Sequence, residues 1–373
     1  MNFEFSEEQN LLREQARGFL KDNCPMSKVR AVLDGATDYD ADLWRKVAEM
    51  GWTAAVVPEE YGGLGLGYLE LVVIAEEIGR AVAPIPFSSS VYLATESLLL
   101  AGSTVQKEAW LPKLATGEVI GTFASAEGQG RVSPTTLTCT VTNGKLSGTK
   151  VPVMDGSIAN IATVLAKSGK GPGLYLVDLN QKSVKRESVN TIDPTRGQAR
   201  LTFDGADAQL LGDEGNGWAL HERLLNRAAV LYAWEQVGGA EAALEQAKEY
   251  ALGRFAFGRP IASYQAIKHK LANMYVKNTL AKSNCYFGAW ALNTDADELA
   301  LAAATARVSA IQAYYFASKE NIQTHGGMGY TWEFDCQFFY RRSKVLSVLI
   351  GSEAQWQDKL VDAALAQQTS DAA

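Results

Sequence analysis

The sequence RFAFGRPIASYQAIKHKLANM, residues 254–274, lies between two helical patterns that are each too long for an ordinary helix. Apolar residues recur at helical spacing from about residue 226 up to this segment, and again from it to about residue 293. A third pattern of this kind covers residues 298–325. Long antiparallel helices with apolar stripes pack into bundles. We therefore expect a bundle of the four-helix type over residues 222–373.

Two regions of different composition precede this bundle. Residues 1–118 show helical periodicity, and Ser6 and Gln9 have the spacing of a capping box at the start of a first helix. Residues 119–221 contain short alternating or apolar runs, such as KLSGTKVPVM, which are separated by turn sequences such as NG, DG and GKGPG. This pattern predicts a compact antiparallel β domain between two helical ones, so the fold class is α+β and multidomain.

Composition and charge exclude several classes of protein. The net charge is −7 and no basic surface is evident, so we expect no nucleic-acid partner. We expect no membrane span, because no run of about 18 apolar residues is present. The acidic amino terminus lacks a secretion signal, and the four cysteines lie far apart, as in a cytoplasmic protein with reduced thiols. The three histidines lack the spacing of zinc ligands, so no metal site is expected.

Residues 254–274 also contain the clearest candidate for a binding site. Arg254 follows a helix, and Phe257 and Gly258 supply an aromatic ring and a position where a ligand can approach closely. An arginine binds pyrophosphate in a bidentate manner, and the amide of Gln265 can pair with a ribose or a ring edge. These residues suit a planar cofactor that bears phosphate. The alternative interpretation is a basic turn that only packs two helices.

Two glycine clusters lie elsewhere in the chain. Gln323, Gly326 and Gly327 follow a long helix, where backbone amides could approach a ligand, although a glycine after a helix is also its commonest cap. The sequence GGLGLG, residues 62–67, has the glycine content of a dinucleotide-binding loop but not its spacing, and no strand precedes it. We interpret this second cluster as a turn.

Taken together, these segments resemble the acyl-CoA dehydrogenase family. The resemblance covers essentially the whole chain, in the order SEEQNLLREQARGFL, VPEEYGGLGLGYLELVVIAEEIGR, LGDEGNGW, RFAFGRPIASYQAIKHKLANM and IQTHGGMGYTWE. It implies an α-helical domain over residues 1–118, a β-barrel-like middle domain over 119–221 and a helical bundle over 222–373. It also implies FAD as cofactor and the α,β-desaturation of acyl-CoA thioesters, in which a carboxylate removes the α proton and hydride passes to the flavin.

The resemblance assigns a cofactor-binding role to one set of residues. Family members hold the FAD pyrophosphate and adenosine with an Arg-x-x-Phe-Gly segment, a following glutamine and a Gln-x-x-Gly-Gly turn. The matching positions in this chain are Arg254, Phe257, Gln265, Gln323, Gly326 and Gly327. In homo-oligomers of the family, many of these contacts reach the flavin of the neighbouring subunit. The same residues could therefore serve a cofactor that is held mainly by a partner.

The middle region departs from the family pattern. Of the usual Thr-Glu-Pro triplet only a glutamate remains, in Ser125-Ala126-Glu127. Where the family has Lys-x-Trp-Ile-Thr beside the flavin ring, this chain has KVPVM, residues 150–154. Proline and methionine cannot donate the hydrogen bonds that a tryptophan and a threonine provide. We therefore expect that the part of the site that contacts the isoalloxazine ring has been lost.

The position of the catalytic base also differs. In many family members a segment that begins Arg-Asp-Ala-Lys ends in Glu-Gly-Thr, and this glutamate is the base. The corresponding segment here is RRSKVLSVLIGSE, residues 341–353, with Ile350 directly before Gly351. An isoleucine cannot accept a proton. Glu235, on the first long bundle helix, is a candidate for a relocated base, and its alternative interpretation is a buried ion pair with an arginine.

Three hypotheses follow from these residues. The chain could be a self-sufficient dehydrogenase that uses Glu235, or a homo-oligomeric family member that binds a ligand without redox activity. We favour a third: it is the non-catalytic subunit of a hetero-oligomeric acyl-CoA dehydrogenase, and a paralogous subunit supplies the base. The losses then fall in the parts that a subunit keeps for itself. By analogy with paired bacterial dehydrogenases, the acyl-CoA substrate could carry a bulky, steroid-type side chain.

Overall fold

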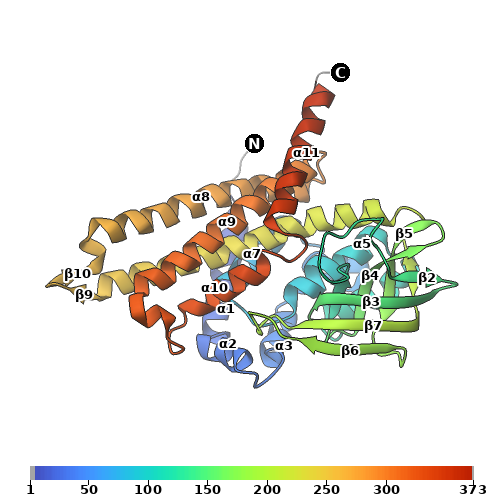
Figure 1. Ribbon diagram of the computed structural model, residues 1–373, viewed down its shortest axis with the longest axis horizontal. Helices are drawn as coiled ribbons and strands as arrows, with labels where there is room; N and C mark the ends of the chain where they lie inside the picture. Colours follow the sequence, from blue (N-terminus) through green and yellow to red (C-terminus); the bar gives the residue numbers. More distant parts are fainter. Residues whose placement is uncertain (1–4, 372–373) are drawn as a thin grey trace. The chain divides into compact units, whose positions relative to one another are not determined.

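The computed structural model describes residues 5–371, which form two compact units that alternate along the sequence (Figure 1). The bundle unit contains the described parts of residues 1–29, 68–83 and 229–373. The sheet unit contains residues 30–67 and 84–228. The bundle unit is therefore built from three separate segments of the chain and the sheet unit from two.

Long helices make up the bundle unit. Its elements are α1 (Glu7–Asn23), α4 (Tyr68–Arg80), the part of α7 (Gly217–Gly253) from residue 229 onward, β9 (Phe255–Ala256), β10 (Arg259–Pro260), η3 (Ile261–Ser263), α8 (Gln265–Asn293), α9 (Leu299–His325), η4 (Gly326–Tyr330), α10 (Cys336–Leu346) and α11 (Glu353–Asp371). The capping box predicted at the first helix is confirmed, because the Ser6 hydroxyl accepts from the Gln9 N–H and the Gln9 side chain accepts from the Ser6 N–H. The predicted bundle helices correspond to α7, α8 and α9.

Small residues let the bundle helices approach each other closely. A Cβ atom placed on Gly238 of α7 would lie 1.8 Å from the carbonyl oxygen of Glu76 on α4, and one on Gly79 would lie 1.8 Å from that of Glu235. The two backbones are thus in direct contact where α4 crosses α7. Next to this crossing, the indole N–H of Trp234 on α7 donates to the carbonyl oxygen of Cys285 on α8. The core depends on glycine at the crossing and on large side chains beside it.

Short helices and one sheet make up the sheet unit. Its elements are the end of α2 (Met26–Leu33), α3 (Ala41–Glu49), η1 (Glu59–Tyr61), η2 (Ser88–Thr95), α5 (Glu96–Ala101), α6 (Thr104–Ala115), β1 (Gly121–Ala124), β2 (Thr140–Thr142), β3 (Lys145–Met154), β4 (Ile161–Ser168), β5 (Gly171–Asp178), β6 (Val184–Val189), β7 (Gln198–Asp207), β8 (Gln209–Leu211) and the start of α7. The segment KLSGTKVPVM forms β3, as its alternating pattern predicts. The segment GGLGLG forms a turn after η1, so that prediction is also confirmed.

The eight strands form one sheet in the order β6-β7-β3-β2-β4-β5-β8, with β1 beside β4. All neighbouring strands are antiparallel except for two parallel pairs, β1 with β4 and β2 with β4. Within the described residues no pairing joins β6 to β8, so the expected barrel-like domain is an open sheet. The edge strand β6, VKRESV, has three consecutive charged residues and no buried one, which disfavours further pairing.

The predicted fold class is confirmed: helices precede a predominantly antiparallel β region, and a helical bundle follows it. The limits of the three domains, 1–118, 119–221 and 222–373, stay predictions from the sequence. All four cysteines are buried, and within the described residues none of them forms a disulfide. In the part of the chain that the structure describes, no helix is long and apolar enough to cross a membrane.

Candidate cofactor-binding site

A hairpin at one end of the bundle unit carries the first predicted binding residues (Figure 1). Helix α7 ends at Gly253, and β9 and β10 then pair through Ala256 and Arg259. The turn between them consists of Phe257 and Gly258, both with positive φ, at 52° and 81°. The Phe257 side chain is 97% exposed. A large aromatic ring at the tip of a two-stranded turn is available for contact with another molecule rather than needed for the core.

Two hydrogen bonds fix the base of this hairpin. The Ile261 N–H donates to the carbonyl oxygen of Arg254 over 2.8 Å, and the hydroxyl of Tyr264 donates to the carbonyl oxygen of Ala256 over 2.9 Å. The guanidinium of Arg259 lies over the Tyr264 ring, 4.0 Å from its centroid. These hydrogen bonds hold the two strands together at the base of the hairpin. Arg254, at this base, is exposed.

The remaining predicted residues lie at the start of α8 and at the end of α9. Gln265 is the first residue of α8, directly after Tyr264, and is exposed. Gln323 is exposed in the last turn of α9, and Gly326 caps that helix with a φ of 60°. A Cβ atom on Gly326 or Gly327 would meet no atom within 4 Å. The Gln-x-x-Gly-Gly turn thus combines a helix cap with an open surface, so the cap is confirmed and the approach of a ligand stays a prediction.

An aromatic contact brings the two helix ends together. The ring of Tyr250, one turn before Arg254, stacks on His325, which directly precedes Gly326, with 4.2 Å between ring centroids. The His325 Nδ1 lies 2.9 Å from the carbonyl oxygen of Asn321, and burial lowers the pKa of this imidazole. The hairpin, the start of α8 and the end of α9 are here called the tip of the bundle. The structure gathers all six predicted cofactor-binding residues at the tip.

The charge of the tip is positive in a protein of net charge −7. No aspartate or glutamate occurs between Glu249 and Asp295. Among the described residues, Arg254, Arg259 and Lys268 form no ion pair with any carboxylate. This local excess of positive charge attracts phosphate groups. The cations of the tip therefore fit a diphosphate group such as that of a dinucleotide.

In the middle region, Pro152 and Met154 offer no hydrogen bond to the ring of a flavin. The Met154 side chain, at the position of the family's threonine, is 5% exposed, and its Sδ accepts from Arg196 Nη2 over 3.0 Å. The carbonyl oxygen of Met154 already accepts from the Thr122 hydroxyl over 2.6 Å. Neither atom is free to bind a ring edge, and Pro152 has no N–H to donate. The loss of the remaining ring contacts stays a prediction.

Glu127, which remains from the family triplet, has a structural role in the sheet unit. Its carboxylate accepts from the buried ammonium of Lys150 over 2.7 Å, from the N–H and hydroxyl of Thr138, and from the N–H of Cys139. Burial tends to raise the pKa of this carboxyl, but the bonds from Lys150, Thr138 and Cys139 outweigh it and lower the pKa to about 2. Glu127 therefore anchors the loop of residues 128–137.

The base segment of the family is a packed turn in this chain. Ile350 and Gly351 lie between α10 and α11 and have positive φ, 57° and 120°. The turn is held from the bundle core, because Arg307 donates to the carbonyl oxygens of Leu346 and Leu349. The segment from residue 343 to residue 352 contains no carboxylate. The turn keeps an ordered backbone without a group that could accept a proton.

Glu235, the candidate for a relocated base, lies inside the bundle unit. Its side chain is fully buried, and its Oε1 is 3.7 Å from Nη1 of Arg342, which is also fully buried. Arg342 also donates to the carbonyl oxygens of Val82 and Ala83. This arrangement corresponds to the alternative interpretation, a buried ion pair that joins α7 to α10 and to the residues after α4.

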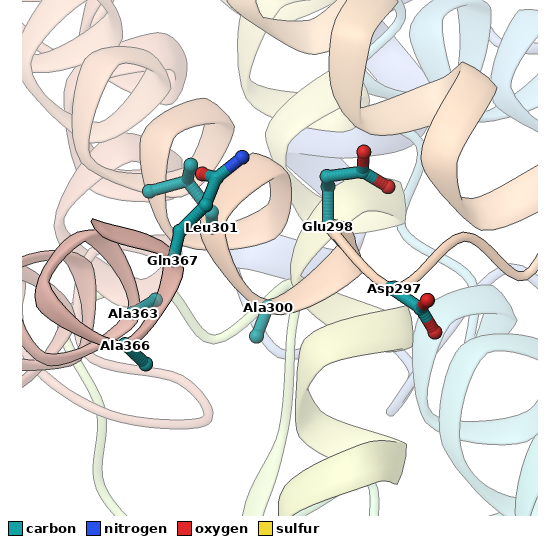
Figure 2. A pocket seen from close by; sticks show the side chains of 7 residues that line it. All are labelled: Asp297, Glu298, Ala300, Leu301, Ala363, Ala366 and Gln367. Carbon is teal, nitrogen blue, oxygen red and sulfur yellow. The ribbon is translucent and has the colours of Figure 1, made fainter. Parts of the chain in front are cut away.

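A cavity of about 410 Å³ lies elsewhere, where α9 begins beside α11 (Figure 2). Its lining is Asp297, Glu298, Ala300, Leu301, Ala363, Ala366 and Gln367. Gln323 lies 22 residues further along α9 than Leu301, about 33 Å at 1.5 Å per residue. This cavity is therefore separate from the tip. In residues 5–371, no three His, Cys, Asp or Glu side chains gather as a metal site.

Sequence reasoning did not find two features of the tip. The stacking of Arg259 on Tyr264 depends on the hairpin geometry, although both residues lie within the quoted segment 254–274. The contact of Tyr250 with His325 joins positions 75 residues apart and leaves no mark in either local sequence. The absence of acidic residues from 250 to 294 is visible in the sequence and could have identified the basic tip.

Two family models match the chain. The model of the acyl-CoA dehydrogenase N-terminal domain matches residues 6–118, and that of the acyl-CoA dehydrogenase C-terminal domain matches residues 215–364. The acyl-CoA dehydrogenase IpdE2 of Mycobacterium tuberculosis is 33% identical over 93% of this chain and 94% of its own length. The acryloyl-CoA reductase (NADH) of Anaerotignum propionicum is 28% identical, over 94% of this chain and 93% of its own.

Solved structures are also similar to this chain. A chain of the Tcur3481-Tcur3483 steroid acyl-CoA dehydrogenase has a TM-score of 0.89 at 28% identity and covers 97% of this chain and 99% of its own. A chain of the ChsE4-ChsE5 complex of Mycobacterium tuberculosis has a TM-score of 0.88 at 24% identity, over 98% of this chain and 99% of its own. The second likeness concerns the fold alone.

Proposed function

Because the chain belongs to the acyl-CoA dehydrogenase family of FAD-binding oxidoreductases, we propose that it is one subunit of a hetero-oligomeric acyl-CoA dehydrogenase. In this proposal it supplies cofactor-binding residues but no catalytic base. A paralogous partner subunit supplies the base and the contacts to the flavin ring. The substrate is an acyl-CoA with a bulky, steroid-type side chain, in line with the steroid acyl-CoA dehydrogenase to which this chain is similar.

One contrast carries the proposal. The residues that a subunit would extend toward a partner are present and exposed at the tip, from Arg254 to Gln323. The residues that a subunit would keep for its own flavin ring are replaced, and Met154 is engaged by Arg196. Random decay of a cofactor site would affect both halves alike. A loss confined to one half is expected if the other half still serves a cofactor on the partner.

The tip has the composition of a recognition surface. Phe255 and Phe257 are 61% and 97% exposed, and Tyr330, just after the glycine turn, is 76% exposed. Aromatic residues and arginine are enriched in the centres of interfaces. Exposed aromatic rings beside unpaired guanidinium groups suit a surface that inserts into a partner and contacts phosphate there. The FAD, when bound, supplies the acceptor for the hydride that leaves the acyl chain.

A self-sufficient dehydrogenase is less well supported. A general base must reach the proton it removes within hydrogen-bond distance. The Glu235 carboxylate is sealed in the bundle interior beside Arg342, and Ile350 cannot take up a proton. The third hypothesis, a homo-oligomer that only binds a ligand, predicts that a partner subunit adds nothing. Flavin content and activity measured with and without a partner subunit distinguish this hypothesis from the proposed function.

The deciding experiment compares the chain alone with the chain produced together with the paralogous subunit encoded next to it. Flavin content, molecular mass and acyl-CoA oxidation are measured for both. The chain alone should be nearly inactive, because loss of a general base costs about 10²- to 10⁴-fold in rate. Full flavin and turnover from the isolated chain would refute the proposal. Lack of flavin and of activity even with the second subunit would favour the ligand-binding homo-oligomer.

Variants of this chain within the pair test the shared site directly. Arg254→Gln should lower the flavin content of the pair, although the ring contacts belong to the partner. Lys277→Gln is the matched control, because it removes a positive charge from α8 at a position where the ammonium lies over the Phe316 ring, away from the tip. Equal flavin content in both variants would show that Arg254 does not serve the cofactor.

A further inference from the structure

Arg259 is a residue of the tip to which the family pattern assigns no role. It lies on β10, and its guanidinium is stacked over the Tyr264 ring at 4.0 Å from the centroid. The Tyr264 hydroxyl is bonded to the carbonyl oxygen of Ala256 on β9, so the ring itself is fixed to the hairpin. Stacking occupies the face of a guanidinium and leaves the N–H groups at its edge available for a bidentate anion.

The charges around Arg259 are not balanced by neighbouring carboxylates. Further along α8 two lysines are paired with carboxylates: Lys270 contacts Glu320 over 2.9 Å, and Lys282 contacts Glu76 over 2.6 Å. Within the described residues, Arg259 has no such partner. Unlike these two lysines, Arg259 keeps a positive charge that no neighbouring carboxylate in residues 5–371 neutralises. Arg259 is arranged instead to meet an anion from outside.

The neighbouring backbone favours the same kind of ligand. Helix α8 has 29 residues, and its N-cap residue, Tyr264, makes no side-chain capping bond. The start of a long helix is its positive end and stabilises negative charge. The Ser263 hydroxyl, one residue earlier, is buried without a hydrogen-bond partner in residues 5–371. These features add hydrogen-bond donors near Arg259 in the sequence, and no aspartate or glutamate occurs between Glu249 and Asp295.

We propose that Arg259, positioned by the Tyr264 ring, is a second anion-binding residue of the tip and takes the diphosphate of a dinucleotide such as the ADP part of FAD. This inference rests on the proposed function, in which the tip serves a cofactor, and it adds Arg259 and Tyr264 to the six residues that the family pattern assigns. Arg259 contacts the phosphate oxygens. Tyr264 holds the guanidinium in one orientation, so that less conformational freedom is lost on binding.

The test measures binding of ADP to the full chain by titration calorimetry. Arg259→Gln should weaken ADP binding about tenfold or more, because it removes a charge-assisted hydrogen bond. Arg259→Lys should bind ADP with an affinity between those of the natural chain and of Arg259→Gln, since an ammonium keeps the charge without the planar fork. Lys277→Gln, on the same helix but outside the tip, should stay within about twofold of the natural chain, because distant exposed charges are screened.

The positioning role of Tyr264 needs its own pair of variants. Tyr264→Phe keeps the ring and loses the bond to Ala256, and it should bind ADP within about twofold of the natural chain. Tyr264→Leu removes the ring and should weaken binding, and combining it with Arg259→Gln should add little, because both act through one guanidinium. If Tyr264→Phe and Tyr264→Leu lose affinity equally, the ring does not position Arg259.

Three further outcomes would overturn the inference. These are no ADP binding by the natural chain, equal binding by Arg259→Gln, and failure of inorganic pyrophosphate to compete where adenosine competes. None of them concerns the flavin content or turnover of the paired subunits. If Arg259→Gln binds ADP normally and the pair still needs Arg254 for its flavin, the proposed function stands without Arg259. If the pair is inactive but Arg259→Gln binds ADP more weakly than the natural chain, the proposed function fails and the anion site remains.

Discussion

Arg307 Nη2 lies 2.9 Å from the carbonyl oxygen of Leu349, the residue directly before Ile350. The same guanidinium donates to the carbonyl oxygen of Leu346 and to the side chain of Gln236, 2.5 Å away. Arg307 is fully buried, and loss of hydration lowers its pKa to about 10. The bundle core thus caps the end of α10 and fixes the turn where the family places its base, although that position now holds an apolar residue.

The left-handed backbone of Ile350 predicts a gain in stability on substitution. A left-handed conformation costs an L-residue about 1–2 kcal/mol, and β-branched residues adopt it least readily. Ile350→Asn should therefore raise the free energy of unfolding by about 1 kcal/mol, measured in urea. Val348→Asn is the control: Val348 is 63% exposed and lacks the positive φ, so its change should stay within about 0.5 kcal/mol. A loss of stability at Ile350 larger than at Val348 would contradict the strain argument.

Glu235→Gln should affect stability rather than chemistry. Arg342 is fully buried and would lose the carboxylate 3.7 Å away, and removal of one partner of a buried ion pair costs about 3–5 kcal/mol. Thermal unfolding should show this loss, while turnover per folded complex of the paired subunits stays unchanged. Glu249→Gln, exposed on the same helix, should change neither quantity. A loss of turnover at unchanged stability would identify Glu235 as the base.

Two glycines of α7 should respond oppositely to alanine. Gly238→Ala would place a Cβ 1.8 Å from the carbonyl oxygen of Glu76, so the crossing of α4 and α7 must open at a cost of about 4 kcal/mol or more. Gly253→Ala meets no atom within 4 Å and should stabilise the helix by up to about 1 kcal/mol. Unfolding in urea measures both. Similar effects at the two positions would mean that the helices do not touch at Gly238.

The carboxyl of Glu127 should make stability depend on acid pH. Its pKa is about 2 in the folded chain, below the ordinary value of 4.5, so the carboxylate contributes stability fully above about pH 4.5. That contribution decreases as the pH falls toward 2, because the unfolded chain then binds the proton more tightly. Glu127→Gln should destabilise the chain at pH 7, and the difference from the natural chain should shrink between pH 4.5 and 2. A difference independent of pH would exclude the ion pair with Lys150.

The parts of the fold that local patterns specify were predictable. The capping box of Ser6 and Gln9, the strand KLSGTKVPVM and the long helices α7, α8 and α9 each follow from neighbouring residues. The strand β6, VKRESV, was not predicted, because an edge strand buries little and its charges hide the alternation. Closure of the sheet could not be decided either, since it depends on pairing between strands far apart in the sequence.

Some features of the candidate site can also be read from the sequence, and others need the structure. The sequence by itself determined which residue types stand at the six tip positions, and that position 350 holds an isoleucine, because these facts need no coordinates. Only the tertiary structure decided that Glu235 is sealed beside Arg342, that Met154 is engaged by Arg196, and that Arg259 is held on Tyr264. The physical reason is that burial, ion pairing and stacking arise between residues that folding brings together, whereas the chemical identity of a side chain is fixed before folding.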